Sequence, residues 1–433
     1  MSRNSVRPPG RAVRTTVVLL VAMLSAVAVA ACGKTSSTTA STSTSASTST
    51  GTTVATSGNG TVVVKTGSTE CGGVATVPVK DQSGVISSLG AAYETAYNAF
   101  PGTVLKSAWA NFKPSHSGDY TIGISVTEPI NNFQAQLIAD LEKAAHAISG
   151  VKKVVTLTAP PDGLTTQIQQ TNQLIQQRVD VIVSEPLAPQ AFLGAADAAG
   201  KAGIPFISLI NTTPSPYAIN LVPNAGEDAL YSGAYLAQLV KQQGTIIGVH
   251  GVPGVAVDTT EMDGWAQAFK QCPNMKFDNS LVGQFQVPIA KQQVQTFLAS
   301  HPQPVTGAVQ SAGMGQAIIQ AFAQAGRPQP AQVDVNPAMG DLVYWNEHKS
   351  TFKAIAFQVP APEMSRATAY TITQLLAGHG PKVNILSEPS PTITADNLSE
   401  WLKPGASVTD PTAVDGPGNT FLPDSYLAPL FNK

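Results

Sequence analysis

The sequence predicts an α/β fold with doubly wound parallel sheets, and two observations lead to this prediction. From Tyr120 onward, short runs of apolar and β-branched residues recur without the alternation of half-exposed strands, so they are expected to be buried on both faces, as in parallel sheets. Stretches with apolar residues on one helical stripe separate these runs. Repeated strand–helix alternation with short connections is typical of doubly wound folds.

Each element is predicted from its own residues. In the first helix, Phe133, Leu137, Leu141 and Ala145 fall on one stripe, which is expected to face the sheet. Strands are predicted at 120–126, 179–184, 204–210, 245–251, 305–311 and 352–359. Helices are predicted at 132–148, 167–178, 226–243, 260–271, 289–300, 313–325 and 363–377, with a further helix over 90–100.

The loops that follow the predicted strands are the expected ligand-binding region, because ligands of such sheets bind beyond the carboxyl ends of the strands. These loops are rich in amides, hydroxyls, Pro and Gly and poor in charge, which favours a neutral or weakly polar ligand. No phosphate-binding loop follows a strand. The loops lie at 128–132, 184–189, 210–215, 251–260, 310–315, 336–340 and 358–363.

Residues 1–31 have the composition of a secretory signal peptide. Four arginines precede an uncharged apolar run over 15–31, which ends in small residues. A run of 17 residues is short for a membrane-spanning helix. Export is therefore expected.

Cys32 follows this run, in the sequence Val29-Ala30-Ala31-Cys32-Gly33. The stretch resembles the bacterial lipobox, which implies cleavage before Cys32 and a diacylglyceryl group on its sulfur; ordinary secretion with an unmodified cysteine is the alternative. Two acyl chains give stable membrane attachment. Because Ser and Thr dominate the residues that follow, 32–69 is predicted to be a disordered tether.

Composition argues against a nucleic-acid partner and leaves open whether two cysteines form a disulfide. Removal of 1–31 leaves 21 basic and 27 acidic residues, a net charge of −6, whereas nucleic-acid binding needs a concentrated basic surface. Cys71 and Cys272 remain besides Cys32, and in an oxidising exported setting they can form a disulfide or stay as thiols. No metal-ligand pattern such as HExxH occurs, and neither a metal nor a cofactor is predicted.

From about residue 118 to 403 the chain resembles the type I periplasmic solute-binding proteins, specifically the ribose/galactose-type group of sugar ABC importers. The resemblance lies in the order of several short motifs rather than in one specific motif. They are YTIGISV at 120–126 followed by NNF at 131–133, RVDVIV at 178–183, AGIPFI at 202–207, Asp263-Gly264-Trp265, and His301-Pro302 ahead of the strand at 305–309.

The resemblance implies two lobes joined by a three-strand hinge. The first lobe is expected at 119–224 and 359–386 and the second at 225–358 and 387–403. An N-terminal extension (70–118) packs on the first lobe, and a Pro/Gly-rich tail (404–433) follows the second. The family binds its solute between the lobes, closes by a hinge motion and docks on a membrane permease. The expected protein is thus a monomeric, lipid-anchored lipoprotein on the outer face of the cytoplasmic membrane, which captures a small neutral sugar or sugar-like molecule.

Some of the family's binding positions are matched in this sequence, and others are not. Phe133 and Phe285 match stacking aromatics, Asn131 and Asn132 match amides that bind sugar hydroxyls, and Gln358 matches a hinge-side glutamine. Core packing by Phe133 and helix capping by either asparagine are the alternatives.

At four places the sequence departs from the family. Ile210-Asn211, Ser311-Ala312 and Asn336-Pro337 stand where the family has carboxylate, arginine or amide groups, and Glu261 replaces an arginine. Arginine and carboxylates are the groups that bind polyols bidentately, so a less charged and more apolar cleft is expected. The candidate contacts there are Asn211, Glu261, Ser311 and Asn336, and an aromatic or cyclic solute fits as well. Glu261 is either a cation partner or a solvated surface charge.

Two other functions compete with import. An enzyme needs paired titratable groups, but the six histidines are scattered and no nucleophile elbow occurs, so no catalytic residue is predicted. A sensor that presents its bound solute to a receptor instead of a permease remains an open alternative.

Overall fold

The computed structural model describes residues 62–433. The predicted signal peptide (1–31), Cys32 and most of the predicted tether lie outside the described residues. Within 62–433, none of the helices combines the length and the apolarity that a membrane crossing requires.

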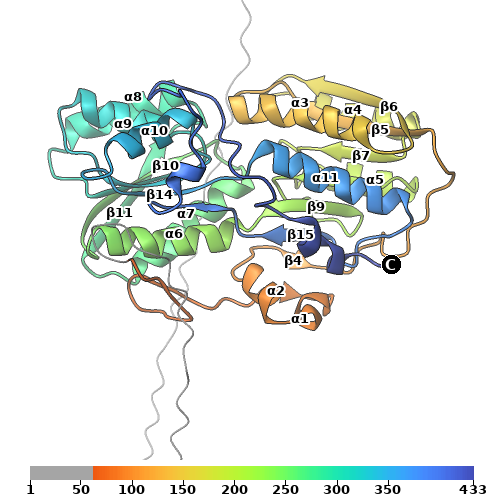
Figure 1. The fold of residues 1–433 in the computed structure, drawn as a ribbon, viewed down its shortest axis with the longest axis horizontal. Helices are drawn as coiled ribbons and strands as arrows, with labels where there is room; N and C mark the ends of the chain where they lie inside the picture. Colours follow the sequence, from red (N-terminus) through yellow and green to blue (C-terminus); the bar gives the residue numbers. More distant parts are fainter. Residues whose placement is uncertain (1–61) are drawn as a thin grey trace, which may run out of the picture. The chain divides into compact units, whose positions relative to one another are not determined.

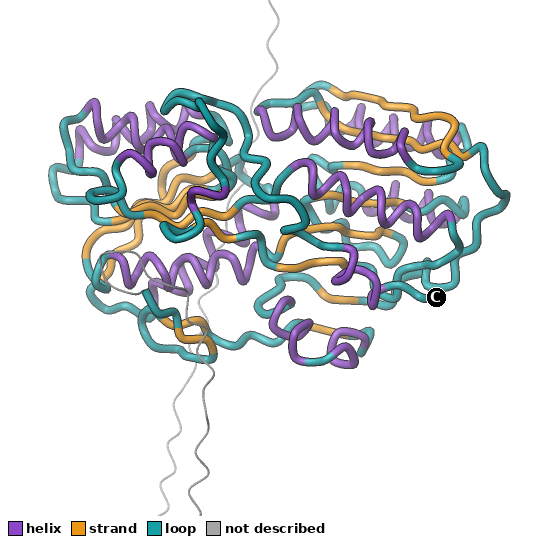
Figure 2. The backbone as a smooth tube through the Cα atoms, viewed as in Figure 1, coloured by secondary structure: helices purple, strands orange, loops and turns teal. Residues whose placement is uncertain are grey.

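Two six-stranded sheets form the centres of two lobes (Figures 1 and 2). The first sheet has the order β15-β9-β8-β7-β5-β6, and all its pairs are parallel. It consists of β5 (Tyr120–Thr127), β6 (Val151–Ala159), β7 (Val181–Ser184), β8 (Phe206–Leu209), β9 (Ala218–Pro223) and β15 (Ile385–Glu388).

The second sheet has the order β11-β10-β12-β13-β14-β16, in which only β16 runs antiparallel to its neighbour. It consists of β10 (Gly244–His250), β11 (Met275–Val282), β12 (Gly307–Gln310), β13 (Ala331–Val335), β14 (Ala354–Phe357) and β16 (Thr392–Ile393). The chain passes between the sheets after β9, after β14 and after β15. The predicted fold class, two parallel-sheet α/β lobes with a three-strand connection, is confirmed.

Helices cover both sheets, and the cores lie between them and the strands. The first lobe carries α3 (Asn132–Ala147), α4 (Leu164–Gln176), α5 (Leu193–Lys201) and α11 (Ala361–Leu376). The second carries α6 (Ala225–Leu239), α7 (Ala256–Lys270), α8 (Val287–Ser300), α9 (Gly315–Gln324) and α10 (Met339–Glu347). Each predicted strand and helix of this region is present within a few residues of its expected limits. The sequence pattern missed β6, β9, β11, β13, β15, α5 and α10.

The N-terminal extension packs on both lobes, whereas the sequence assigned it to the first lobe alone. Its first part, with β2 (Gly73–Val74), and the residues just before it, with β1 (Lys65–Thr66), bury Val74 and Val64 in the core beneath α6 and α7. The end of the predicted tether, 62–69, is therefore part of the fold, and the burial of Val64 offsets part of the entropy that this segment loses.

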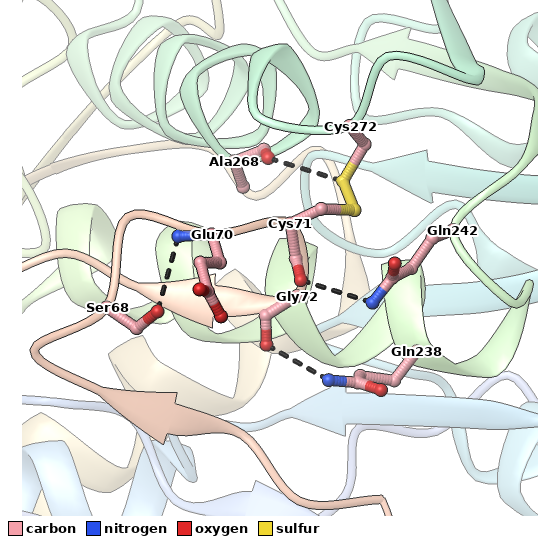
Figure 3. The surroundings of a disulfide bond; sticks show 8 residues. All are labelled: Ser68, Glu70, Cys71, Gly72, Gln238, Gln242, Ala268 and Cys272. Carbon is pink, nitrogen blue, oxygen red and sulfur yellow. Dashed lines mark hydrogen bonds between the residues drawn. A yellow bond between two sulfur atoms is a disulfide. The ribbon is translucent and has the colours of Figure 1, made fainter.

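A disulfide fastens this first part to the second lobe (Figure 3). Cys71 is bonded to Cys272, just after α7, with a sequence separation of 201 and a Cα–Cα distance of 4.7 Å. Gln238 of α6 and Gln242, which follows that helix, donate hydrogen bonds to the carbonyls of Gly72 and Cys71, each at 3.2 Å. The pairing that the sequence left open is thus present.

The second part of the extension packs on the first lobe. It contains β3 (Lys80–Asp81), α1 (Val85–Leu89), α2 (Ala91–Ala96) and β4 (Thr103–Val104), so the helix expected over 90–100 is shorter, and α1 precedes it as a separate short helix. Ile86, Tyr97 and Trp109 are buried in the first-lobe core. The Tyr97 hydroxyl donates to the carbonyl of Ile385 in β15 at 2.8 Å.

The C-terminal segment from Leu398 onward, which includes the predicted tail (404–433), also crosses between the lobes. Trp401 and Val414 are buried in the second-lobe core, whereas Phe421 and Phe431 are buried in the first-lobe core. The tail contains α12 (Asp424–Leu427) and two 3₁₀ turns, at Leu398–Glu400 and Ala428–Leu430. The predicted Pro/Gly-rich segment 404–433 is therefore an integral part of the fold, held by its apolar residues.

Substitution of Gly380 by alanine is expected to displace the extension. A Cβ atom at Gly380 would lie 1.7 Å from the Trp109 carbonyl oxygen, and backbone atoms move only with their segment. We expect a loss of about 1–3 kcal/mol of unfolding free energy from overpacking, measured by urea denaturation. Gly194→Ala in α5, where a Cβ meets nothing within 4 Å, is the matched control. Equal stability of the two variants would contradict this packing.

Candidate functional site

A cavity of about 350 Å³ lies between the two lobes, at the carboxyl ends of their parallel strands. Its lining comes from the loops after β5, β6, β7, β8, β10, β11, β12, β13, β14 and β15 and from the N-terminal turns of α3, α6 and α7. Two further cavities, of about 340 and 300 Å³, share lining residues with it and extend the cleft. This is the size of small-molecule sites and the expected position for a ligand in open α/β sheets.

The backbone at the strand ends around this cavity is held in the left-handed region. Ile210 after β8 has a φ of 64° and Phe285 after β11 a φ of 57°. Ala312 after β12 and Asn336 after β13 have φ values of 56° and 47°, and all four residues line the cavity. Positive φ is unfavourable for residues with a Cβ, most of all for β-branched Ile210. Strain of this kind gathers at ligand sites, so the backbone marks the same place as the cavity.

Two aromatic rings enter the cavity from different lobes. Phe133, in the first turn of α3, lines the cavity and also packs against the first-lobe core, so the core role is present and the stacking role stays a prediction. Phe285 belongs to the second lobe, and its ring lies against Gly251: a Cβ there would be 2.0 Å from a ring carbon. The two rings offer apolar faces to a ligand.

Three of the predicted asparagines line the cavity, and their side chains differ in hydrogen bonding. The Asn131 side chain caps α3 by accepting from the Gln134 amide at 2.9 Å, and Asn336 accepts from the Val359 amide at 3.2 Å. Asn211 is 8% exposed, and its Oδ1 atom has no hydrogen-bond partner among the described residues. A buried acceptor without a partner is unfavourable unless a ligand or a water supplies a donor.

The remaining predicted residues lie outside the central cavity. Asn132 lines the neighbouring cavity of about 340 Å³ and donates from Nδ2 to the Pro411 carbonyl of the C-terminal tail at 2.7 Å. Gln358 lines that cavity too, although it is only 1% exposed. Ser311 is fully buried behind the wall, where its hydroxyl donates to Glu261 at 2.5 Å.

The cavity is acidic, which corrects the expectation of a less charged cleft. Asp162, Glu185, Asp228 and Glu261 line it, and there is no lysine, arginine or histidine among its described lining residues. Glu185 directly follows β7, in a loop expected to line the site, but it was not predicted as a site residue. Asp228 lies in α6, a helix that follows a crossover, and its position at the cleft depends on how the two lobes meet.

Burial without a compensating cation raises the pKa of three of these groups, Glu185, Asp228 and Glu261. Desolvation is the main cause that raises the pKa of Glu261 to about 8, and the nearby Asp258 and Asp228 also raise it. A hydrogen bond from Ser311 acts in the opposite direction and lowers this pKa. Desolvation also raises the pKa of Asp228 well above its usual value and raises that of Glu185. Glu261 is thus a buried group of the site and not a solvated surface charge.

His250 is the described histidine nearest in sequence to these loops, and its partner indicates a structural role. Its Nδ1 lies 2.8 Å from Oδ2 of Asp258, whose other oxygen accepts from the Gly251 amide at 2.7 Å. The pair therefore holds the loop on which Phe285 packs. Within 62–433 no group of three or more His, Cys, Asp or Glu residues is arranged to hold a metal ion.

Comparison with known proteins relates the two lobes to one family. The sequence pattern of the family described as periplasmic binding protein domain matches residues 122–380. The ribose import binding protein RbsB of Bacillus subtilis (strain 168) is 30% identical over 155 residues, which cover 34% of this chain and 48% of that protein. The chain thus aligns with about half the length of this curated relative.

Solved structures share the fold at lower identity. A solute-binding protein of an ABC transporter from Thermobispora bispora DSM 43833 superposes with a TM-score of 0.59 and 24% identity, covering 66% of this chain and 89% of that one. One from Bacillus halodurans C-125, with bound myo-inositol, gives 0.59 and 17%, covering 66% and 98%. One from Mycobacterium smegmatis, with bound glycerol, gives 0.59 and 20%, covering 68% and 99%.

Proposed function

Because this chain belongs to the periplasmic binding protein domain family, we propose that it is the solute-binding component of an ABC importer. Its solute is a sugar or a sugar-like molecule, held in the cleft between the lobes. The relatives support this class: one is a ribose import binding protein, and others have myo-inositol or glycerol bound.

The observation that carries the proposal is the cavity that both lobes line. Phe133 and Asn211 come from the first lobe, and Glu261 and Phe285 from the second. A ligand that contacts both walls favours the closed arrangement, because only that arrangement provides all its contacts. Three connecting segments between the lobes suit a hinge motion. Closure then presents a surface to a permease that differs from that of the open form.

The N-terminus supports attachment to the membrane. Export is expected of a binding protein that serves an importer, and the Cys71–Cys272 disulfide is consistent with an oxidising compartment. We place the mature protein on the outer face of the cytoplasmic membrane, anchored through acyl chains on Cys32. Mass spectrometry of the first peptide tests this: a diacylglyceryl mass on Cys32 supports the anchor, and an unmodified thiol on protein recovered from the medium contradicts it.

Binding without turnover is the expected activity, and a thermal-shift screen tests it. The purified protein is heated with sugars, polyols, nucleosides and aromatic acids in turn. A ligand at 100 times its dissociation constant adds about 2.7 kcal/mol to the unfolding free energy, which gives a measurable rise in Tm. Stabilisation by a sugar or polyol that is recovered unchanged supports the proposal. Stabilisation by aromatic acids alone, or conversion of the compound, contradicts it.

Replacement of Phe285 by alanine is expected to weaken binding of the solute that the screen identifies at least about tenfold, equivalent to about 1.4 kcal/mol. The substitution removes the second-lobe ring from the cavity wall. Isothermal titration calorimetry measures the affinity. Leu193→Ala, at an exposed apolar position of α5 outside the cavity, is the control. An unchanged affinity in the Phe285 variant would place the solute elsewhere.

A further inference from the structure

The charge of the interlobe cavity narrows the class of solute. Its walls combine two chemical features, apolar surface and carboxyl groups, with no basic side chain among the described lining residues. A site for a purely neutral polyol needs both donors and acceptors, because every hydroxyl is both. The carboxyl-bearing residues are Asp162, Glu185, Asp228 and Glu261, and the larger apolar ones are Ile130, Phe133, Leu187, Ile210, Val252, Val255, Val257, Phe285, Val335 and Val359.

None of the four carboxyl groups has an ionic partner within the described chain. Both oxygens of Asp228 accept from the Ser390 amide, at 2.9 and 3.2 Å. Glu185 accepts from the Gln134 side chain at 3.1 Å, and Oε2 of Glu261 accepts from Ser311. These neutral donors satisfy part of the carboxyl groups of Glu185, Asp228 and Glu261. A buried carboxylate is normally paired with a cation, and the described lining offers none, so burial raises the pKa of these groups and a positively charged ligand would allow them to ionise.

An independent observation indicates that the ligand group that binds here donates hydrogen bonds. Asn211 lines the same cavity, is 8% exposed and has an Oδ1 atom without a partner in the described chain. The buried polar atom of the cavity that lacks a partner in the described chain is thus an acceptor, and Glu185, Asp228 and Glu261 become further acceptors when they ionise. A protonated amine carries a positive charge and up to three N–H donors and no acceptor. It fits this set better than a hydroxyl does.

We propose that the solute is a sugar-like molecule that carries a protonated amine, an amino sugar or an aminocyclitol. Its ammonium group binds beside Glu261 and Asp228, and its apolar ring face contacts Phe133 or Phe285. This inference rests on the proposed function, because it names the solute of the same cleft.

The raised pKa values add a consequence for pH. Glu261 faces Asp228 and Asp258, Asp258 is paired with His250, and Asp228 faces Glu227 and Glu388. With a pKa of about 8, Glu261 is largely protonated near neutral pH in the free protein. A bound ammonium ion favours the carboxylate, so binding releases a proton. The affinity for an amine therefore rises with pH toward 8 and falls again where the amine itself loses its proton.

Calorimetric titration of the purified mature protein tests the proposal. The probes are matched pairs: D-glucosamine against D-glucose and N-acetyl-D-glucosamine, and an aminodeoxyinositol against myo-inositol, each between pH 6 and 9. We expect at least one amine to bind ten or more times as tightly as its neutral partners. Titrations in buffers of different ionisation enthalpy should show a release of up to about one proton per amine at pH 7 and none for the neutral partners.

Variants assign the preference to the carboxyl groups. Glu261→Gln and Asp228→Asn should reduce the preference for the amine at least tenfold, and Glu261→Gln should abolish most of the proton release. Asp341→Asn is the matched control, because Asp341 is also buried, also has a raised pKa of about 7, and lies in α10 outside the cavity lining. It should leave both properties unchanged, and circular dichroism checks that each variant is folded.

The outcomes separate the two proposals. Neutral sugars that bind as tightly as the amines would overturn the amine preference and leave the importer function intact. An amine preference that survives in both site variants would overturn the assignment to these carboxyl groups. Absence of binding by every sugar-like probe would count against the proposed solute class and against the amine together.

Discussion

Replacing both Cys71 and Cys272 with serine is expected to lower the free energy of unfolding by about 2–5 kcal/mol, the range typical of native disulfides. The bond closes a loop of 201 residues, and in the chain-entropy account the unfolded state gains more freedom the longer the opened loop. The loss here should lie toward the upper end of that range. Urea denaturation under non-reducing conditions measures it.

The structural consequence of losing the disulfide should be confined at first to the N-terminal extension. Its segment on the second lobe is otherwise held by the burial of Val64 and Val74 and by the hydrogen bonds from Gln238 and Gln242. Limited proteolysis of the double variant should therefore cut between about 62 and 77 before it cuts the lobes. Cys32→Ser, which leaves the bond in place, is the control. An unchanged urea midpoint would mean that burial alone fixes the extension.

The protein without ligand is expected to lose stability as the pH rises from about 5 to 8. In the described residues, burial raises the pKa of a set of carboxyl groups in the folded state. These are Glu227, Asp341 and Glu388, each to about 7, Glu261 to about 8, and Glu185, Asp228 and Asp334. A carboxyl group with a raised folded pKa binds its proton more tightly in the folded state. Its contribution is complete below the unfolded pKa, near 4, and is lost as the pH passes the folded value.

Each unit of pKa difference is worth about 1.4 kcal/mol, so the combined loss across this window is expected to be several kcal/mol. Thermal unfolding at intervals of half a pH unit should show a Tm that falls steadily between pH 5 and 8. Glu261→Gln and Glu227→Gln should each flatten part of that slope, because glutamine does not titrate. A Tm that rises over the same interval would contradict the direction. A bound amine should reduce the slope, since it stabilises the carboxylate of Glu261.

How much of the fold the sequence predicts depends on where each strand lies in its sheet. The interior strands β5, β7, β8, β10, β12 and β14 are continuous apolar runs and were predicted, whereas interior β9 and β13 were missed. The edge strands β6 and β11 were missed too, because polar residues that are exposed or half-buried interrupt their apolar runs, such as Lys152 and Lys153 in β6 or Asp278 in β11. In β13 the polar Gln332 and Asp334 are buried instead. Asp334 accepts a hydrogen bond from Gln310 of β12, a contact that no local pattern reveals.

The candidate site, too, was predicted only in part. Loop position and residue type pointed to Asn131, Phe133, Asn211 and Phe285, which the structure brings to one cavity. The acidic character of that cavity was not foreseen, although its residues were visible in the sequence. Asp228 belongs to a helix that follows a crossover, and a lone carboxyl on a helix is usually solvated. Only the packing of the two lobes removes water from it.

The sequence by itself determined the class of the protein: alternating buried strands and amphipathic helices, with polar loops at one end of each strand, depend on local periodicity. The tertiary structure alone decided three things. It joined Cys71 to Cys272 at a sequence separation of 201, and it packed the N-terminal extension and the C-terminal tail against both lobes. It also gathered carboxyl groups from separate elements into a cavity with no lysine, arginine or histidine among its described lining residues. All three are relations between distant parts of the chain. Such relations exist only after the sheets have formed and have brought those parts together, and so they leave no periodic signal along the chain.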